Sequence, residues 1–466
     1  MKPSRIIKFL LLASTPLLLA SCFSAKRYGR PENIVTADYY RTDRLPQDSL
    51  TMATIPWKEL FTDPLLQTYI ETALTNNIDI RIAIQQILIS EAYLKQGKAG
   101  YFPTLNATAQ YSHTELSENS QFGGQLDKLD QYQLSGGLSW EADIWGKLRS
   151  NSRATRARYL QSVAAHKAVK STLVADIAVN YYQLLALDEQ IGITENTIAT
   201  RLHALETTKA LKEAGIVTEV AVKQTEAQLY NVQAILIALK NRARLSENVL
   251  SILMGENPTS LERGALDDQR ITTELKTGVP LQLLANRPDV MAAEYGLINA
   301  FEQTNMARAN FYPALTLTAN GGLQSLDFEK LFDSSSLFAT VLGGLTQPLL
   351  NGRKIRTQYE VARAQQEQAK QKFRFTLLNA GKEVSDALYF YEAATETMKI
   401  KEREYAAYSM ATDYSEELLN NGLVNYLEVL TARQNALNSS LDVANQKNNR
   451  LQAVVALYQA LGGGWQ

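Results

Sequence analysis

The second half of the chain is a diverged copy of the first half. Four short motifs occur twice in the same order, at nearly constant spacing: Asp79 and Asp289 are 210 positions apart, and Gly215 and Gly422 are 207 apart. The paired motifs are 76–80 and 286–290, 101–105 and 311–315, 136–138 and 343–345, and 215–217 and 422–424. A period this long indicates a duplicated half-molecule rather than a solenoid repeat. We therefore expect one body built from two related halves.

Each half contains a helical pattern followed by two short stretches of alternating apolar and polar residues. The first helical pattern covers 63–100, and alternation in 105–111 and 132–140 predicts a hairpin over 104–140. The second half predicts the equivalent hairpin over 314–347. One apolar and one small-polar face is typical of strands between lipid and water, and also of strands in a soluble sandwich.

The hairpins are followed by unusually long helical runs. Residues 151–214 and 357–421 contain no proline and one glycine each, Gly192 and Gly381. A helix of about 60 residues is roughly 90 Å long, about three times the hydrocarbon thickness of a membrane. Because both runs are rich in charged residues, we expect them to lie in water and to pack as coiled coils.

Glycine and proline mark the predicted ends of these elements. Gly215 and Gly422 end the long helices, and shorter helices return over 219–254 and 425–461. Each half therefore predicts an antiparallel helical hairpin with a glycine at its tip. The other expected turns are helix-to-strand turns at Pro103 and Pro313, and strand-to-helix turns at Gly146 and Gly352.

The N-terminus has the pattern of an exported lipoprotein. Lysine and arginine precede a short apolar run that ends in Leu-Ala-Ser before Cys22, the only cysteine of the chain. This pattern predicts a signal peptide over 1–21 and lipidation of Cys22, because it resembles the bacterial lipobox. By the same resemblance, Phe23 favours the outer membrane. Residues 22–62 are expected to form a lipid-anchored tether, mostly extended over 23–55.

Composition and motifs argue against several other functions. The chain has 47 Lys and Arg against 48 Asp and Glu, so no large basic field favours nucleic acid. His113, predicted in a surface loop, and His166 and His203, far apart on one helix, do not have metal-ligand spacing. No phosphate loop, dinucleotide fingerprint or nucleophile elbow is present. We therefore expect no catalytic residue, no metal and no cofactor.

The predicted hairpins constrain how many chains must assemble. Four strands cannot close a barrel, and an open sheet edge in lipid leaves backbone groups unpaired at a cost of several kcal/mol each. If these strands cross a membrane, several chains must combine their strands. A ring of identical chains would then form one barrel continuous with one helical tube.

Several stretches closely resemble the outer membrane efflux channel family, the TolC-like proteins, in its lipid-anchored branch. The resemblance covers about residues 50–460, and the most specific stretches are Arg-Pro-Asp-Val at 287–290 and Trp-Gly at 145–146. The other matching stretches are Trp57, 61–65, 73–74, 76–80, 101–103, 140–149, 280–281, 284–285, 293–294 and 311–313.

The resemblance implies a mainly α fold with a small β part and an internal duplication. Long antiparallel coiled-coil helices would form a periplasmic tunnel joined to a membrane β-barrel, with four strands per subunit and twelve in a homotrimer. In the sequence, the first channel repeat is 63–285, including a connecting segment at 255–285, and the second is 286–466. The implied partners are a periplasmic adaptor, an inner-membrane efflux transporter and outer membrane lipid.

The resemblance also implies a gate and docking sites at the helical tips. Leu427 corresponds to an apolar plug and Glu428 to an acidic neighbour, whereas Thr431 stands where one related pattern has aspartate. Which residue sets the charge at the opening therefore stays open. Leu427 is equally typical of coiled-coil core, and Glu428 of a solvated helix face. Gly215 and Gly422 mark the tips where an adaptor would dock.

We therefore predict a passive outer membrane exit channel of a tripartite efflux pump, not an enzyme. One alternative is an exit duct for type I protein secretion. Another is a lipid-anchored periplasmic coiled-coil scaffold without a pore, for which the alternating hairpins would have no use. The sequence does not distinguish among drugs, dyes, metal ions and detergents as cargo.

Overall fold

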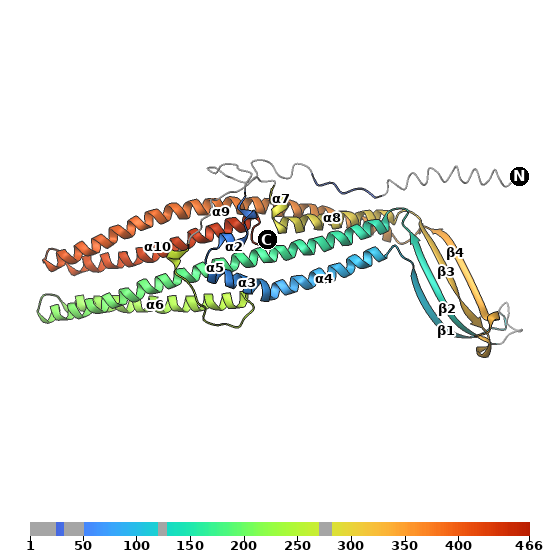
Figure 1. Cartoon of the computed structure of the whole chain (residues 1–466), viewed down its shortest axis with the longest axis horizontal. Helices are drawn as coiled ribbons and strands as arrows, with labels where there is room; N and C mark the ends of the chain where they lie inside the picture. The colour runs from blue at the N-terminus through green and yellow to red at the C-terminus, as the bar shows by residue number, and fades with distance from the viewer. Residues whose placement is uncertain (1–24, 32–50, 120–127, 270–281) are drawn as a thin grey trace. The chain divides into compact units, whose positions relative to one another are not determined.

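The computed structural model describes residues 25–31, 51–119, 128–269 and 282–466, and within them one series of elements occurs twice (Figure 1). The first copy consists of α3 (Pro64–Asn76), α4 (Ile78–Ala99), β1 (Thr104–Glu115), β2 (Lys128–Ala142), α5 (Lys147–Glu213) and α6 (Glu219–Leu253). The second consists of α7 (Leu283–Asn286), α8 (Pro288–Ala309), β3 (Ala314–Ser325), β4 (Leu337–Thr346), α9 (Lys354–Asn420) and α10 (Tyr426–Leu461). Helices α4 and α8 both have 22 residues, and α5 and α9 both have 67, so the predicted duplication is confirmed.

The helix expected over 63–100 is interrupted at one residue, which corrects the prediction of a single helix. Asn77 has an extended backbone, and its side-chain oxygen accepts hydrogen bonds from the backbone N–H groups of Asp79 and Ile80 at 2.9 and 3.1 Å. The side-chain amide donates to the carbonyl of Leu253 at 2.8 Å. An asparagine that caps the following helix therefore divides α3 from α4.

The four strands form one antiparallel sheet in the order β1-β2-β3-β4. Each hairpin pairs internally, and the two hairpins join because β2 pairs with β3, for example Gly136 with Gly321. In the part of the chain that the structure describes, β1 and β4 are edge strands. The strands are longer than the alternating stretches 105–111 and 132–140 predicted, because pairing continues to Glu115 and Lys128.

Glycine allows β2 and β3 to approach closely near the middle of the sheet. A Cβ atom placed on Gly322 would lie 2.1 Å from the backbone oxygen of Leu134. A Cβ atom on Gly344, in the neighbouring strand β4, would meet nothing within 4 Å. The close contact with β2 therefore requires glycine at position 322, whereas the space around Gly344 would admit a side chain.

Contacts divide the chain into two compact units, and each unit contains parts of both sequence repeats. The first comprises Met1–Glu32, Ile87–Ser162 and Ala293–Phe373, and therefore includes the sheet. The second comprises Asn33–Gln86, Val163–Ala292 and Arg374–Gln466. The repeats are therefore intertwined rather than folded as two separate halves.

Part of the predicted tether belongs to the core of the second unit. Met52 lies in a 3-10 helix (η2, Met52–Thr54) and is fully buried, and Phe61 follows the short helix α2 (Trp57–Leu60). The Phe61 ring meets the Tyr458 ring edge-on at 6.2 Å, and the Tyr458 hydroxyl donates to the carbonyl of Ile55 at 2.6 Å. The expectation of mostly extended chain over 23–55 therefore fails at 52–54, where apolar side chains are buried.

In the second unit, α5 and α6 run antiparallel, as do α9 and α10 (Figure 1). Leu205, Val222 and Leu229 form an apolar cluster between α5 and α6, with Ile198 packed against it. The short 3-10 helix η3 (Leu266–Asp268) follows α6, whereas η5 (Phe328–Lys330) and η6 (Ser334–Ser336) lie between β3 and β4 of the first unit. Apolar packing therefore holds a helical hairpin together, as the coiled-coil pattern predicts.

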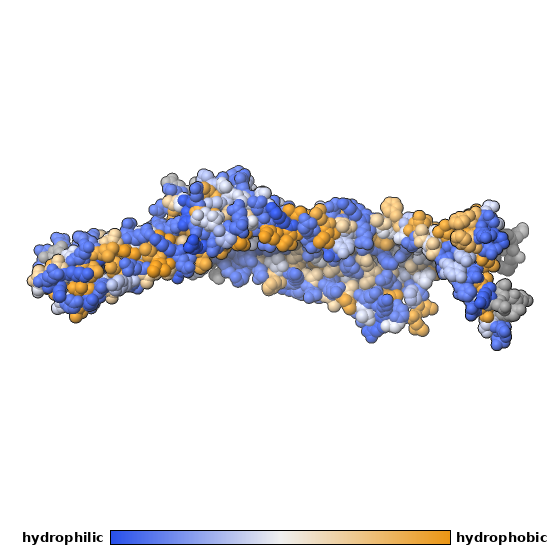
Figure 2. Space-filling model, turned by 90° about the horizontal axis from the view of Figure 1, so that it is seen from below, coloured by the Kyte–Doolittle hydropathy of each residue, from blue (hydrophilic) through white to orange (hydrophobic). Residues whose placement is uncertain are grey.

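The helices carry both apolar and hydrophilic surface. Figure 2 shows apolar patches interrupted by hydrophilic ones on the face that it displays. Ile237 and Ile252 of α6, for example, are 71% and 61% exposed. None of the described helices combines the length and the apolar character that crossing a membrane requires.

We expect Gly322→Ala to destabilise the protein by about 1–3 kcal/mol, because the added methyl group would overlap backbone that cannot rotate away. Gly344→Ala is the matched control, because the same change in the adjacent strand meets open space. Thermal unfolding of the two purified variants in detergent measures the difference. Equal midpoints would contradict the close approach of β2 and β3.

Candidate functional site

The register of the sheet separates apolar from polar side chains. Because successive residues point to opposite faces, each row across the four strands belongs to one face. One row is apolar, consisting of Leu105, Leu138, Ala319 and Val341. The adjacent row points to the other face and consists of Asn106, Gly137, Asn320 and Thr340. Leu105 and Val341 are 75% and 73% exposed, so the chain itself does not cover the apolar face.

Aromatic side chains lie near both ends of the apolar face. At one end, the rings of Tyr111 and Tyr132 are 5.0 Å apart, and Phe328 meets Tyr132 edge-on at 5.4 Å. At the other end, the indole nitrogen of Trp140 donates to the carbonyl of Tyr101 at 2.9 Å. Aromatic residues on both sides of an apolar band are typical of strands that cross an outer membrane.

The predicted turn residues lie between the helices and the sheet. Pro103 and Pro313 directly precede β1 and β3, after α4 and α8 have ended. Gly146 and Gly352 precede α5 and α9 with φ of 75° and 60°, in the left-handed region that favours glycine. The indole nitrogen of Trp145 donates to the carbonyl of Pro313 at 2.7 Å, which ties a turn of the first repeat to one of the second.

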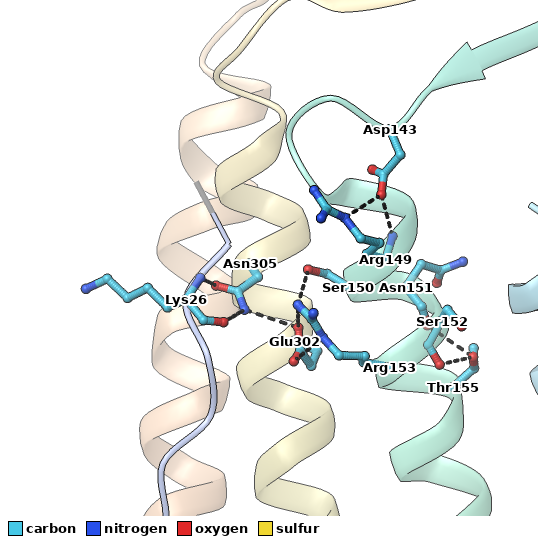
Figure 3. Close-up of polar contacts among 10 residues, drawn as sticks. All are labelled: Lys26, Asp143, Arg149, Ser150, Asn151, Ser152, Arg153, Thr155, Glu302 and Asn305. Carbon is cyan, nitrogen blue, oxygen red and sulfur yellow. Dashed lines mark hydrogen bonds and ion pairs between the residues drawn. The ribbon is translucent and has the colours of Figure 1, made fainter. Parts of the chain in front are cut away.

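The segment 25–31 lies against α8 and is held by a pair of backbone contacts (Figure 3). The backbone N–H of Lys26 donates to Asn305 Oδ1 at 3.3 Å, and Asn305 Nδ2 donates to the carbonyl of Lys26 at 3.0 Å. Ala25 lies beside the turn at Gly146, because a Cβ atom on that glycine would be 3.1 Å from the Ala25 Cβ. Cys22 and the signal peptide lie outside the described residues.

Side chains of the same segment contact Glu294 of α8. Arg30 donates from Nε and Nη2 to the two oxygens of this carboxylate, both at 2.7 Å. The Tyr28 hydroxyl donates to Glu294 Oε1 at 3.4 Å, and the Tyr28 ring meets Phe301 edge-on at 5.7 Å. Burial, and then the Glu294 charge, raise the pKa of Tyr28, so its phenol stays protonated as a donor. Contacts with Asn305 and with Glu294 therefore hold segment 25–31 at two positions along α8.

An ion pair between a buried carboxylate and an exposed arginine orients the asparagine that holds the segment. Glu302 of α8 is 3% exposed in its side chain and accepts from Arg153 of α5 at 2.7 and 3.0 Å. The same carboxylate accepts from Asn305 Nδ2 at 3.1 Å, as Figure 3 shows. A carboxylate that is paired and hydrogen-bonded in this way tolerates burial. Glu294 lies in a stretch that carries the family resemblance, but neither it nor Asn305 or Glu302 was predicted as a site residue, because their partners Arg30, Lys26 and Arg153 lie far away in the sequence.

The two tip glycines close equivalent turns. Gly215 and Gly422 have φ of 76° and 69°, and nothing lies within 4 Å of a Cβ atom on either, so only the backbone conformation requires glycine. The N–H of the next residue donates back to the helix at 2.9 Å in both turns, from Ile216 to Leu211 and from Leu423 to Leu418. Ile216 and Leu423 are 69% and 71% exposed, so each tip presents an apolar side chain.

The three predicted gate residues lie in the first turns of α10, on its exposed side. Leu427 is 56% exposed, and Glu428 and Thr431 are also exposed, whereas the intervening Val429 and Leu430 are buried. Asn425 caps the helix by accepting from the Glu428 N–H at 3.2 Å. Leu427 is therefore not buried within its own chain.

A tyrosine beside the gate residues joins the two repeats. The Tyr426 hydroxyl lies 3.0 Å from the hydroxyls of both Thr208 on α5 and Thr225 on α6. Further along, α5 and α10 meet through more polar side chains, including Gln190 with Asn445 at 2.7 Å. Tyr426 was not predicted as a site residue, because a tyrosine at the start of an amphipathic helix has no distinctive signal in the sequence.

The histidines do not form a metal site in the described residues. His113 lies in β1 rather than in the predicted loop, and its Nδ1 is 2.6 Å from Asp130 on β2. His166 and His203 both lie on α5, as predicted. Among residues 25–31, 51–119, 128–269 and 282–466, no group of three or more His, Cys, Asp or Glu side chains could hold a metal ion.

Strands with one apolar and one polar face, joined to long coiled-coil helices, define a membrane channel protein with a large water-exposed part. The family model for outer membrane efflux proteins matches residues 69–256 and 279–463. The chain therefore belongs to the outer membrane efflux protein family. It is an outer membrane channel component of an efflux pump, as the sequence analysis predicted.

Similar proteins agree over nearly the whole chain. The chain is 28% identical over 454 residues to the solvent efflux pump outer membrane protein SrpC of Pseudomonas putida, covering 96% of this chain and 97% of the relative. It is 26% identical over 476 residues to the cation efflux system protein CusC of Escherichia coli, with both chains fully covered. A crystal structure of a membrane protein from Pseudomonas aeruginosa shares the fold, with a TM-score of 0.88 at 24% identity over 95% of this chain and 97% of that one.

We expect Tyr426→Phe to destabilise the helical body by about 1 kcal/mol, because it removes the hydroxyl that lies between two buried threonines and keeps the ring. Tyr230→Phe is the matched control, because Tyr230 is 58% exposed and its hydroxyl contacts the partly exposed Glu226. Thermal unfolding of both variants provides the comparison. A midpoint for Tyr426→Phe equal to that of the control would show that this contact adds no stability.

Proposed function

We propose that three copies of this chain form one twelve-stranded barrel in the outer membrane, with the polar face of each sheet toward a water-filled lumen. Two features of the sheet support this proposal. One face is apolar and exposed, and within the described residues the edge strands β1 and β4 have no partner on their outer sides. In lipid, backbone groups at such edges need partners. Pairing of β1 with β4 of the next copy would satisfy them all.

The exposed face of the sheet argues against the pore-free scaffold. A soluble sandwich would cover its apolar face with a second layer, whereas β1 and β4 are exposed over nearly all of their length. The family match and the pump proteins among the relatives favour efflux over protein secretion.

Exposed apolar side chains on the helices support assembly below the barrel. Ile78 of α4, Ile237 of α6 and Tyr389 of α9 are between 63% and 75% exposed in the single chain. Helices that meet water on every side rarely keep such residues, so neighbouring copies are the natural cover. The helices of three copies would then line a tunnel through the periplasm.

The helical tips are the proposed docking sites for a periplasmic adaptor, which connects the channel to an inner-membrane transporter. Ile216 and Val220 are exposed beside Gly215, and Leu423 is exposed beside Gly422. Exposed apolar residues on a rigid turn can pack against another protein at an interface. Both tips carry the same backbone turn, so an adaptor could contact them in the same way.

Leu427, Glu428 and Thr431 are the proposed gate. All three are exposed in one chain and lie within two turns of the start of α10. A threefold ring of Leu427 would present apolar side chains to a water-filled opening, and Glu428 would add negative charge beside it. Hydrophobic constrictions and charged rings are established ways to close and select in channels.

Cys22 is the proposed lipid attachment site. Ala25, three residues later in the sequence, lies beside Gly146 at the end of the strands. Three residues span at most about 11 Å, so the anchor would enter lipid at the rim of the barrel. Segment 25–31 would thereby connect membrane lipid to α8.

We propose a passive conduit rather than an enzyme, in which partners supply energy and selectivity. The polar face of the sheet carries mainly asparagine, glutamine, serine and threonine, and no constellation of catalytic side chains occurs in the described part of that face. Its one charged side chain among the described strand residues, Glu141, is paired with Lys147 at 3.0 Å. Small molecules fit this mostly uncharged lining. The relatives are named for cargoes as different as solvents and cations, so the lining does not select one cargo.

Neighbouring cysteine variants test the orientation of the sheet. Leu317→Cys and Thr318→Cys place thiols on opposite faces of β3, in a chain whose only native cysteine is Cys22. We expect a charged methanethiosulfonate reagent to lower single-channel conductance in Thr318→Cys and to leave Leu317→Cys unchanged, because only the first thiol faces water. The unmodified channel provides the baseline.

The opposite result, with Leu317→Cys sensitive and Thr318→Cys insensitive, would reverse the proposed faces. An absence of channels in lipid bilayers from folded protein would reject the barrel itself.

The combined substitution of Leu427→Ala and Glu428→Ala should raise resting conductance, because it removes both the apolar plug and the neighbouring charge. Ile216→Ala with Val220→Ala is the control, because it removes exposed apolar side chains from the other tip. Single-channel recording without adaptor measures the effect. Unchanged conductance in the gate variant would remove these residues from the gate.

A further inference from the structure

A buried arginine lies between the helical hairpins of the two repeats. Arg201 of α5 is 3% exposed. Its Nη1 donates to Gln228 of α6 at 2.7 Å, and its Nη2 donates to Gln434 of α10 at 3.0 Å. Within the described residues, its buried Nε–H has no hydrogen-bond partner. The guanidinium of this α5 residue therefore contacts α6 and α10, and its Nε–H has no hydrogen-bond partner in the described part of the chain.

The charge of Arg201 also has no counter-charge. Both glutamine partners are neutral, and no carboxylate in the described part of the chain acts on this guanidinium. Arg433 lies nearby with its own charge, and its Nε donates to Glu416 at 2.7 Å. Burial, and then the charge of Arg433, lower the pKa of Arg201. Arg433 is thus paired with Glu416 at a partly exposed position, whereas Arg201 is buried beside a second cation without a counter-charge, which is unfavourable without an anion.

A pocket of about 310 Å³ lies beside the two arginines. Arg201 and Arg433 line it together with Asn196, Thr200, Tyr405 and Thr412. The two threonine hydroxyls donate to carbonyls of their own helices, at 3.0 and 2.9 Å, so they do not compete as donors. The N–H groups of Arg433 that do not contact Glu416, the Asn196 amide and the Tyr405 hydroxyl remain to donate to a bound anion.

We propose that this pocket is a binding site for a small anion, held by the charges of Arg201 and Arg433 between α5, α9 and α10. A halide or a small carboxylate in the pocket supplies the negative charge that Arg201 lacks within the chain. Buried charges in proteins are paired, and here the chain supplies the cations, the donors and the space without the counter-ion.

Occupancy of the site would stabilise the contact between the two repeats close to the proposed gate. Gln434 receives a hydrogen bond from Arg201 and lies three positions after Thr431 on α10. An anion that neutralises Arg201 therefore favours the arrangement in which α5 and α10 stay together. A ligand that binds only this arrangement raises its stability in proportion to its occupancy.

The experiment compares the purified channel in chloride and in gluconate, an anion too large for close approach, at equal ionic strength. We expect chloride to raise the thermal midpoint of the natural protein by about 2 °C or more. Arg201→Gln should lose this difference, because it keeps a polar side chain but removes the charge. Arg242→Gln, an exposed arginine of α6 outside the pocket, should keep it.

Diffraction from crystals of the natural protein in bromide locates the anion directly, so the result does not depend on whether a variant folds. An anomalous peak within about 4 Å of the Arg201 guanidinium supports the proposal. The proposal is wrong if the crystal shows no bromide at Arg201 and a carboxylate of a neighbouring copy contacts it instead. It is also wrong if chloride raises the thermal midpoints of Arg201→Gln and Arg242→Gln equally. Neither readout uses conductance, so the site and the channel are tested separately.

Discussion

The need to pair backbone groups at the edges of the sheet determines the rest of the architecture. Strands β1 and β4 have partners on one side only within the described residues, and the apolar face beside them is exposed. Lipid satisfies the side chains of that face but offers nothing to an unpaired N–H or C=O group. A single copy of this sheet is therefore incomplete, and the apolar surfaces on its helices are consistent with the same requirement for neighbours.

The helical body combines two kinds of contact with different strengths. Within a hairpin, leucine and valine pack as in the cluster of Leu205, Val222 and Leu229. Between the repeats, α5 and α10 meet through polar groups such as Gln190 and Asn445. Water can replace a polar contact at modest net cost, whereas exposing an apolar one costs more.

Much of the fold follows from patterns that the chain carries locally. Alternation marked the hairpins, uninterrupted helical periodicity marked α5 and α9, and glycines marked the tips at Gly215 and Gly422, all of which depend on near neighbours in sequence. The pairing of β2 with β3, and the contact of residues 25–31 with α8, join segments far apart in the chain. No local period records such contacts, so Asn305, Glu302 and Arg201 could not be identified from the sequence. Asn77 was missed for a different reason, since its capping role interrupts an otherwise continuous helical pattern.

Asn305 recognises the main chain of Lys26 and not its side chain. Any residue except proline could therefore stand at that position and still form both bonds. The number of residues is more constrained, because an insertion or deletion between Cys22, the proposed acylation site, and Lys26 would change how much chain is available to reach the bilayer. Between Cys22 and Lys26, the number of residues is therefore more constrained than their identity.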